Sequence, residues 1–519
     1  MIFNSYQFLF VYLPVVLIGT FLLARFSAGA AQIWLIAASL FFYAAWNVDY
    51  LPMLLGSVVF NYVIAMYMVR VSNPEVRSLQ LGFAVLVDLG LLGYYKYTGF
   101  FLENLNAVSG STYTWRSLIL PLGISFYTFQ QLTLLADISS GRIKDFRFRD
   151  FLLFVTFFPH LIAGPIVHHR EMMPQFQKAS YRLDWENIAV GCVLLSIGLF
   201  KKSILADGIA DHITPIFNDA STGKPISFAY AWAAAIGFTL QMYFDFSGYS
   251  EMALGLARMV GIKLPMNFNS PLKALSIVDY WSRWHITLTR FLTAYIYNPI
   301  AVAQARRRSA SGKKGLAGTR TTWGAFAGIV AMPTMVTMFL SGLWHGAGNQ
   351  FLIFGVLHGT ALVINHAWRL VRPRVWPDSE HYRRTTWPIA WLLTFLIVMV
   401  ALTWFHAASV TAGTNIIVGL TGAHGIVLPE EGVEFATMYV WIVLLMVIVL
   451  VPPNTLEILH AWQPAITMPA AAVGLYAWHG WQGRIKLSLT PICGVATGVF
   501  LAIGVLGLNR VSEFLYWHF

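Results

Sequence analysis

The sequence predicts an all-α protein, a polytopic bundle of transmembrane helices. Of its 519 residues, 57% are hydrophobic and only 11% are charged, and the mean hydropathy is +0.63. A soluble globular protein carries about 25% charged residues, so this composition excludes a soluble enzyme. Aromatic residues make up 15% of the chain, which suits a protein that crosses two membrane–water interfaces. Period-2 alternation is absent, which argues against a β-barrel and favours helices.

The apolar stretches predict about 11 to 14 membrane segments, including re-entrant half-helices, because a helix needs about 20 residues to cross a bilayer. The predicted segments cover residues 6–24, 30–48, 51–69, 79–97, 117–136, 151–167, 187–209, 226–258, 323–343, 351–368, 386–407, 437–452, 466–478 and 489–508. No polar stretch between them is long enough for a soluble module. We therefore expect residues 1–519 to form a single membrane-embedded domain. The first segment lacks the features of a cleaved signal peptide and is expected to be retained.

The basic loops predict the orientation in the membrane. Arg25, Arg70 and the run 142–149 follow alternate segments, whereas the polar linker 103–113 contains no Lys or Arg. Cytoplasmic loops are enriched in Lys and Arg, so the N-terminus is expected to be periplasmic in a bacterial inner membrane. The same rule explains the excess of 34 Lys and Arg over 23 Asp and Glu. A nucleic-acid partner is therefore not expected, and the lipid bilayer is the surrounding partner.

The segment 151–167 breaks this alternation. It is short, Pro159 and Pro165 interrupt it, and basic residues flank it on both sides. A re-entrant pair of half-helices with both ends in the cytoplasm explains these features. Irregular backbone at membrane depth occurs only where protein buries it or water reaches it, so a cavity is expected nearby.

His345 is the most informative single residue. It follows the uncharged segment 323–343, in the run Ser341-Gly342-Leu343-Trp344-His345-Gly346. Basic linkers at 306–320 and 369–384 place both ends of this helical hairpin in the cytoplasm, so His345 should lie towards the outside. An ionisable group at such depth is costly unless it is solvated, paired or used. A neutral imidazole can take a proton from a hydroxyl and return it; a hydrogen-bonded core histidine is the alternative.

A second histidine, His285, lies ahead of the basic linker and so nearer to the cytoplasm. The two imidazoles are expected to line one path from opposite sides. Arg283 and Arg290 lie on roughly one helical face. Arg283 and Trp284 are therefore candidates for contacting a phosphate-bearing cofactor that arrives from the cytoplasm, although an ordinary interfacial helix would have the same composition.

Other polar residues inside apolar runs are candidates for a cavity wall. Asp245 lies in the run 241–250, which is dense in Tyr and Ser, and a purely structural role is its alternative. The Lys201-Lys202 pair is interpreted as the end of a span, with snorkelling side chains. The predicted substrate-cavity residues are Tyr243, Asp245, Tyr249, Trp344 and Asn349.

The sequence does not predict a metal site or a disulfide. His358 and His366 are eight residues apart, without partner carboxylates or cysteines. Cys192 and Cys493 both lie inside apolar runs, without metal-ligand spacing. Nucleophile-elbow, Walker and dinucleotide-binding motifs are absent from the sequence.

A series of ordered runs resembles a known family. The runs are Pro121-Leu122-Gly123-Ile124-Ser125-Phe126-Tyr127-Thr128-Phe129-Gln130, Phe158-Pro159-His160-Leu161-Ile162-Ala163-Gly164-Pro165-Ile166, Gly198-Leu199-Phe200-Lys201-Lys202, Tyr243-Phe244-Asp245-Phe246-Ser247-Gly248-Tyr249-Ser250, Asn267-Phe268-Asn269-Ser270-Pro271, Trp281-Ser282-Arg283-Trp284-His285-Ile286 and Gly342-Leu343-Trp344-His345-Gly346, with the ending at 514–519. In this order they resemble the membrane-bound O-acyltransferase (MBOAT) family. The similarity is closest to its bacterial branch, which acetylates alginate or attaches D-alanine to teichoic acid.

The resemblance implies an acyltransferase of the O-acetyltransferase type. Such a protein moves an acyl group from a cytoplasmic thioester, here acetyl-CoA, through a tunnel to a hydroxyl. The resemblance implies that His345 is the essential histidine and that His285 is the second one, towards the cytoplasm. No tightly bound cofactor is implied. The family often has two arginines before its Trp-His pair, whereas this sequence has Ser282-Arg283.

The implied acceptor is an exported polysaccharide or a Ser of a periplasmic relay protein that resembles a serine hydrolase. D-alanyl transfer from a carrier protein to a cell-envelope polymer is the alternative within the enzyme class. A non-enzymatic polysaccharide export subunit is the alternative outside it, with histidines that relay protons or support the structure.

Overall fold

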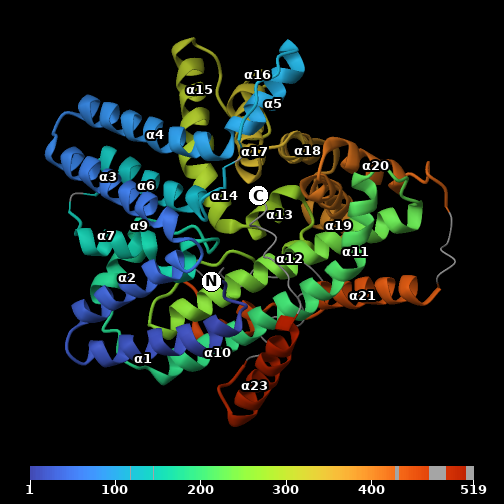
Figure 1. Ribbon diagram of the computed structural model, residues 1–519. Coiled ribbons are helices and arrows are strands. Elements are labelled where there is room, and N and C mark those ends of the chain that lie inside the picture. The colour runs from blue at the N-terminus through green and yellow to red at the C-terminus, as the bar shows by residue number, and fades with distance from the viewer. Residues whose placement is uncertain (117, 144, 427–431, 467–486, 510–519) are drawn as a thin grey trace.

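The computed structural model describes residues 1–116, 118–143, 145–426, 432–466 and 487–509 (Figure 1). Within these ranges the chain is helical and contains no β-strand. The seven helices that are long and apolar enough to cross a membrane are Val48–Arg70, Pro74–Lys96, Trp185–Ser221, Trp323–His345, Asn349–Val375, Ser379–His406 and Gly432–Trp462. Shorter apolar helices are Phe8–Ala24, Ala28–Ala44, Val410–Leu420 and Pro491–Leu506. The predicted all-α transmembrane fold is confirmed, and the chain is a multi-pass membrane protein.

The helices follow one another along the chain. The first half contains α1 (Leu13–Ala24), α2 (Ala28–Ala44), α3 (Leu51–Arg70), α4 (Pro74–Lys96), α5 (Thr98–Ser109), α6 (Ile124–Ser139), α7 (Phe148–Thr156), α8 (Phe158–Leu161), α9 (His169–Lys178), α10 (Trp185–Phe200), η3 (Lys201–Ala206), α11 (Asp207–Ser221) and α12 (Phe228–Met259). The second half contains α13 (Ile277–Arg283), α14 (Ile286–Leu292), η5 (Thr293–Tyr297), α15 (Asn298–Ala310), α16 (Trp323–Phe326), η6 (Ala327–Ala331), α17 (Met332–His345), α18 (Asn349–Val375), α19 (Ser379–His406), α20 (Val410–Leu420), α21 (Gly432–Leu450), α22 (Thr455–Ile458) and α23 (Pro491–Leu506). The predicted segment 466–478 lies, apart from its first residue, outside the described residues, as does the ending 514–519. The single domain stays a prediction.

Helices α10 and α12 lie against each other (Figure 1). Glycines form the line of contact. A Cβ atom added to Gly198 would lie 2.6 Å from the carbonyl oxygen of Gly248, and one added to Gly191 would lie 2.7 Å from that of Gly255. The two glycines on α10 are seven residues apart, and so are the two on α12. Seven residues are about two helical turns, so the glycines of each helix lie on one face. Small residues let helix backbones approach closely, which drives association within a membrane.

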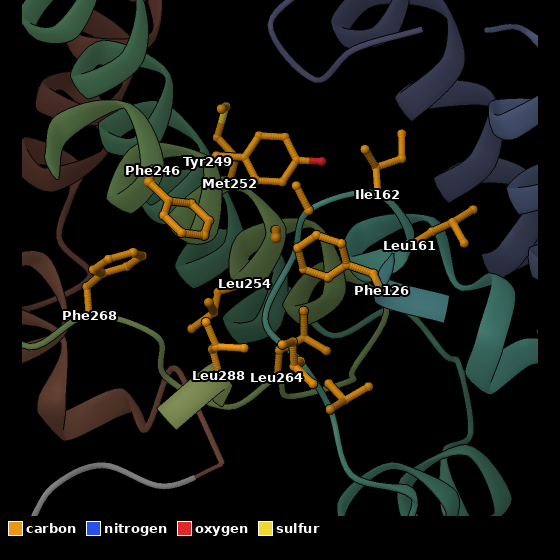
Figure 2. Packing of buried hydrophobic residues seen from close by; sticks show 14 of the residues in the cluster. Phe126, Leu161, Ile162, Phe246, Tyr249, Met252, Leu254, Leu264, Phe268 and Leu288 are labelled. Atoms are coloured by element: carbon orange, nitrogen blue, oxygen red, sulfur yellow. The ribbon is translucent and has the colours of Figure 1, made fainter. Parts of the chain in front are cut away.

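The segment predicted to be re-entrant is broken in the structure. It consists of α7 and the single turn α8, followed by irregular backbone up to α9. Arg142, ahead of the segment, and Arg170, behind it, both contact Asp137, at 3.1 and 3.3 Å. The chain therefore returns to the place where it entered. Figure 2 shows Leu161 and Ile162 of this segment opposite Tyr249 and other α12 residues in a closely packed apolar layer.

The interpretation of Lys201 and Lys202 as the end of a span is wrong. Both lie inside one continuous helix, Trp185–Ser221, so the predicted segment 187–209 ends too early. Lys202 is 2% exposed and pairs with Asp207 at 2.9 Å and with Asp245 at 2.7 Å. Lys201 pairs with Glu251 at 2.5 Å. These carboxylates, two of them on α12, neutralise the lysines, which a one-dimensional hydropathy pattern does not reveal.

Candidate active site

His345 is the last residue of α17, and the neighbouring helix α4 holds that end in place. Helix ends leave carbonyl groups without intrahelical partners. Here the Lys96 ammonium donates hydrogen bonds to the carbonyl oxygens of Trp344 and His345, the latter at 3.4 Å. The Tyr97 hydroxyl donates to the carbonyl oxygen of Leu343 at 3.0 Å. Two adjacent residues of the α4 end therefore cap consecutive carbonyls of the His345 helix.

The hairpin of α17 and α18 sets the position of the His345 ring. A Cβ atom on Gly342 would lie 2.3 Å from the carbonyl oxygen of Phe351, and one on Gly355 would lie 2.4 Å from that of Met338. The two helices are in backbone contact there, three residues before His345. The imidazole packs edge-on against Phe354 of α18 and Phe405 of α19, with ring centroids 5.8 and 5.2 Å away.

His285 lies in the bend between α13 and α14 and is almost fully buried, with 1% exposure. Its φ of 43° places it in the left-handed region, which is uncommon for a residue other than glycine and is a strain found at functional sites. The centroid of its ring lies 6.5 Å from that of His345. Two histidines that are 60 positions apart in the sequence are thus neighbours inside the molecule.

Hydrogen bonds fix the tautomer of His285 when its ring is neutral. The Asn267 side-chain oxygen accepts from the backbone N–H of Thr287 at 3.3 Å and from its hydroxyl at 2.8 Å. That atom is therefore an acceptor, and the His285 Nδ1 that lies 3.1 Å from it must be the donor. The lone pair of a neutral His285 is then on Nε2. The Thr287 hydroxyl in turn accepts from the backbone N–H of Ile166, at 3.0 Å, in the re-entrant segment.

The predicted cofactor-binding residues, Arg283 and Trp284, are held by contacts within the protein, mostly with residues of α13. Arg283 Nε donates to Asp279 at 2.8 Å, and its guanidinium also reaches the carbonyl oxygen of Asn269 at 3.4 Å. The Arg283 side chain is largely buried. Trp284 stacks on Tyr280, with centroids 5.7 Å apart. Both residues are thus packed around the His285 bend.

The predicted substrate-cavity residues fall into different surroundings. Trp344 lies beside His345, with centroids 4.8 Å apart, and lines the same cavity. Tyr249 stacks on Phe3 at 4.9 Å and points its hydroxyl towards the re-entrant segment (Figure 2). Asn349 begins α18 and bonds to Asn104 at 3.4 Å.

The other two candidates are both on α12. Asp245 forms the ion pair with Lys202 described above. Tyr243 is buried and packs against Phe244 and Phe268. The structure therefore brings His345, His285 and Trp344 together. Asp245 is instead paired with Lys202, and Tyr243 contacts Phe268.

His358 belongs to the packing around the histidine pair. Its Nδ1 accepts a hydrogen bond from the Trp281 indole at 3.2 Å, and its ring lies 4.6 Å from that of Phe354. Because an indole N–H is only a donor, the lone pair of Nδ1 is engaged. Within the described residues, no group of three or more His, Cys, Asp or Glu side chains is arranged to hold a metal ion.

Two cavities meet beside His345. The inner cavity has a volume of about 60 Å³ and is lined by His345, Trp344, Lys96 and residues of the 120–126 and 162–163 segments. The outer cavity has a volume of about 610 Å³ and is lined by the turn after His345, the end of α19 and the aromatic rings of Tyr95 and Trp115. Lys96 and Leu120 line both cavities. Ligand pockets usually measure about 300–1,000 Å³, so of these two cavities the outer one is large enough for a sugar or a peptide loop.

Sequence reasoning missed the supporting residues of this site. Asn267 and Thr287 are ordinary polar residues in the sequence, and only the fold brings them to His285. Lys96 carried a signal that was available, since it is a cation at the end of an apolar segment. The carbonyl groups that it binds are 248 and 249 residues away in the chain.

Comparisons with known proteins agree with this architecture. Residues 107–316 match the model of the membrane-bound O-acyltransferase family. The chain is 39% identical to a peptidoglycan O-acetyltransferase of Helicobacter pylori, over 84% of this chain and 83% of that protein. It is 38% identical to the probable alginate O-acetylase AlgI of Azotobacter vinelandii, over 78% of this chain and 75% of that protein. It is 29% identical to a teichoic acid D-alanyltransferase of Streptococcus thermophilus, over 49% of this chain and 58% of that protein.

These similarities confirm the resemblance inferred from the ordered runs. The two relatives with the higher identities are the peptidoglycan O-acetyltransferase and the probable alginate O-acetylase. Each aligns with most of this chain and with most of its own length. The chain is therefore an acyltransferase, and the alternative of a non-enzymatic export subunit is not supported. It belongs to the membrane-bound O-acyltransferase family.

Proposed function

We propose that this protein transfers an acetyl group from a cytoplasmic thioester, acetyl-CoA, across the bacterial inner membrane to a hydroxyl of an exported polysaccharide or of a periplasmic relay protein. The single observation that carries the proposal is the pair of buried imidazoles, 6.5 Å apart, next to a cavity. The names of the relatives, which act on peptidoglycan and alginate, support a cell-envelope polysaccharide as the final acceptor.

His345 is the general base in this proposal. It takes the proton of the acceptor hydroxyl as the hydroxyl oxygen attacks the thioester carbonyl carbon, and it then returns the proton to the departing sulfur. His285 is the second imidazole, with Nε2 as its acceptor atom when neutral. Asn267 holds its orientation. Arg283 and Trp284 stabilise the bend that carries His285. Asp279 binds the Nε atom of Arg283, so a contact of Arg283 with the donor would use the other guanidinium nitrogens.

The donor and the acceptor approach from different sides in this proposal. A third cavity, of about 340 Å³, lies between α13, α14, η5, α17 and α18 and is lined by Trp281, Ser282 and Thr337 among others. Its lining includes Tyr297, the residue before α15, the helix that leads to the basic linker. In this proposal the cavity is a route for the narrow arm of the thioester. The outer cavity receives the acceptor, since it opens at the end of α17 opposite to that linker. In this proposal the N-terminus is periplasmic, as the distribution of basic loops predicts.

The test is the amount of ester-linked acetate on the exported polysaccharide in wild-type, deletion and His345→Ala strains, with the protein level in the membrane measured in each. We expect His345→Ala to lower acetate to the level of the deletion strain while the protein stays abundant. Unchanged acetate in the deletion strain would refute acetyl transfer. If the deletion strain loses acetate and the His345→Ala strain keeps full acetate, the assignment of His345 as the general base is refuted.

D-alanyl transfer is the second candidate, because relatives named teichoic acid D-alanyltransferases align with about half of the chain. The same strains distinguish the two. Loss of ester-linked D-alanine in the deletion strain, with acetate unchanged, would favour a D-alanyl donor on a carrier protein.

A further inference from the structure

Lys96 has no role in the mechanism above, although it lies at the junction of the inner and outer cavities. It ends the membrane-spanning helix α4. Within the described residues, no carboxylate forms a salt bridge with its ammonium group. An intramembrane cation is costly and is usually paired or functional, so its retention here needs a physical reason.

The carbonyl end of α17 supplies part of that reason. A lysine ammonium has three N–H donors, and Lys96 directs them at two acceptors, the carbonyl oxygens of Trp344 and His345. The C-terminal end of a helix carries a partial negative charge that favours a cation. The ammonium is thereby fixed 3.4 Å from the backbone of the residue proposed as the base. One N–H donor remains for a group inside the cavity.

We propose, on the basis of the acyl transfer proposed above, that Lys96 is a further catalytic residue that stabilises the negative charge on the donor carbonyl oxygen. When the acceptor oxygen bonds to the carbonyl carbon, its proton passes to His345 and the carbonyl π electrons move to the oxygen, which Lys96 contacts. The C=O bond then re-forms, the C–S bond breaks, and His345 gives the proton to the sulfur. Electrostatic stabilisation of such an oxyanion by a preorganised donor is a large part of acyl-transfer catalysis.

The competing explanation is that Lys96 only caps α17. Three variants separate charge from capping. Lys96→Gln keeps hydrogen-bond donors but has no charge, Lys96→Arg keeps the charge, and Tyr97→Phe removes the neighbouring cap and keeps Lys96. The assay uses inverted membrane vesicles with radiolabelled acetyl-CoA and measures label in ester form, with rates normalised to the folded protein recovered by size exclusion.

We expect Lys96→Gln to lower kcat by about 100-fold, the typical effect of losing one oxyanion donor, with little change in the KM for acetyl-CoA. Lys96→Arg should retain more kcat than Lys96→Gln, and Tyr97→Phe should stay close to wild type. Wild-type kcat in Lys96→Gln, or equal losses in Lys96→Gln and Tyr97→Phe, would overturn the proposal. If Lys96→Gln does not accumulate, Lys96→Ala is assayed with added ethylammonium, where a restored rate supports the proposal and an unrestored rate overturns it.

His345→Ala in the same assay separates this proposal from the one on which it rests. An inactive His345→Ala together with a fully active Lys96→Gln would refute only the role of Lys96. A fully active His345→Ala would refute the proposed base, whatever the Lys96 variants show.

Discussion

The orientation of His285 depends on polar groups from three separate segments: the side chains of Asn267 and Thr287 and the backbone N–H of Ile166. Asn267 accepts from the His285 ring and from Thr287, and the Thr287 hydroxyl accepts from Ile166. The His285 Nδ1–H, the Asn267 oxygen and the Thr287 hydroxyl are each hydrogen-bonded, which helps a buried polar network to hold one conformation. The histidine is therefore coupled to the re-entrant segment that forms one wall of the inner cavity.

Replacing Asn267 tests whether this orientation matters for transfer. In Asn267→Leu, the His285 ring loses the acceptor that fixes its tautomer, and Thr287 loses the same partner. We expect acyl transfer to fall by about 100-fold, as for other displacements of catalytic groups, in the vesicle assay described above. Asn267→Asp keeps the acceptor oxygen and is the matched control. Wild-type rates in Asn267→Leu would show that the network is not needed for activity.

The ion pairs of Lys202 give a prediction about stability. Lys202→Met leaves Asp207 and Asp245 without their cation inside the helix bundle. Removing one member of a buried charge network destabilises a protein by about 3–5 kcal/mol. Thermal denaturation in detergent should show a clear decrease in the midpoint. Lys224→Met, which breaks the exposed pair with Asp219, is the control and should denature almost as wild type does. Equal midpoints for the two variants would contradict this reasoning.

At the scale of helices, hydropathy predicted most membrane segments correctly but not all their ends. The predicted range 226–258 matches α12, Phe228–Met259, and the range 386–407 overlaps α19, Ser379–His406, and ends one residue after it. These helices are apolar over most of their length, so composition alone identifies them. The predicted range 187–209 ended too early, because the apolar run stops before Asp211 and His212 whereas the helix continues to Ser221.

The α17–α18 contact should be sensitive to a single methyl group. Gly342→Ala would place a Cβ atom 2.3 Å from the Phe351 carbonyl oxygen, so the helices must separate and the His345 ring must move with α17. Overpacking of this kind costs about 1–3 kcal/mol, and we expect lower thermal stability together with lower transfer activity.

The control is Gly56→Ala in α3, where a Cβ atom would meet nothing within 4 Å. Alanine has the higher helix propensity, so this variant should be at least as stable as wild type. Similar behaviour of the two variants would mean that the α17–α18 contact is more adaptable than the backbone distances indicate.

At the scale of the whole molecule, the sidedness of the membrane helices decides how donor and acceptor meet. The basic linker after α15 and the turn after α17 lie at opposite ends of the Trp323–His345 helix. The predicted orientation places the linker in the cytoplasm and the turn towards the periplasm. The donor and the acceptor would then reach His345 from opposite sides.

Accessibility of introduced cysteines tests this orientation. The exposed residues Ser109, at the end of α5, and Ser311, after α15, are each replaced by Cys in a protein that lacks Cys192 and Cys493. In intact cells whose outer membrane is permeabilised, a membrane-impermeant thiol reagent should label Ser109→Cys and not Ser311→Cys. The reverse pattern would invert the proposed topology and with it the direction of transfer.

The sequence by itself determined the fold class, the family and the two histidines of interest. Hydropathy is a property of local composition, and ordered motifs are read along the chain, so neither requires knowledge of distant contacts. The break at 151–167 was also predictable, because proline removes backbone donors locally.

Only the tertiary structure decided which polar groups meet. It placed His285 next to His345, Asn267 beneath His285, and Lys96 on the carbonyl end of α17. It also paired Asp245, a candidate for the cavity wall, with Lys202. The physical reason is that charges and hydrogen bonds inside a membrane are satisfied by partners from other helices, and those partners are specified by packing rather than by position in the chain.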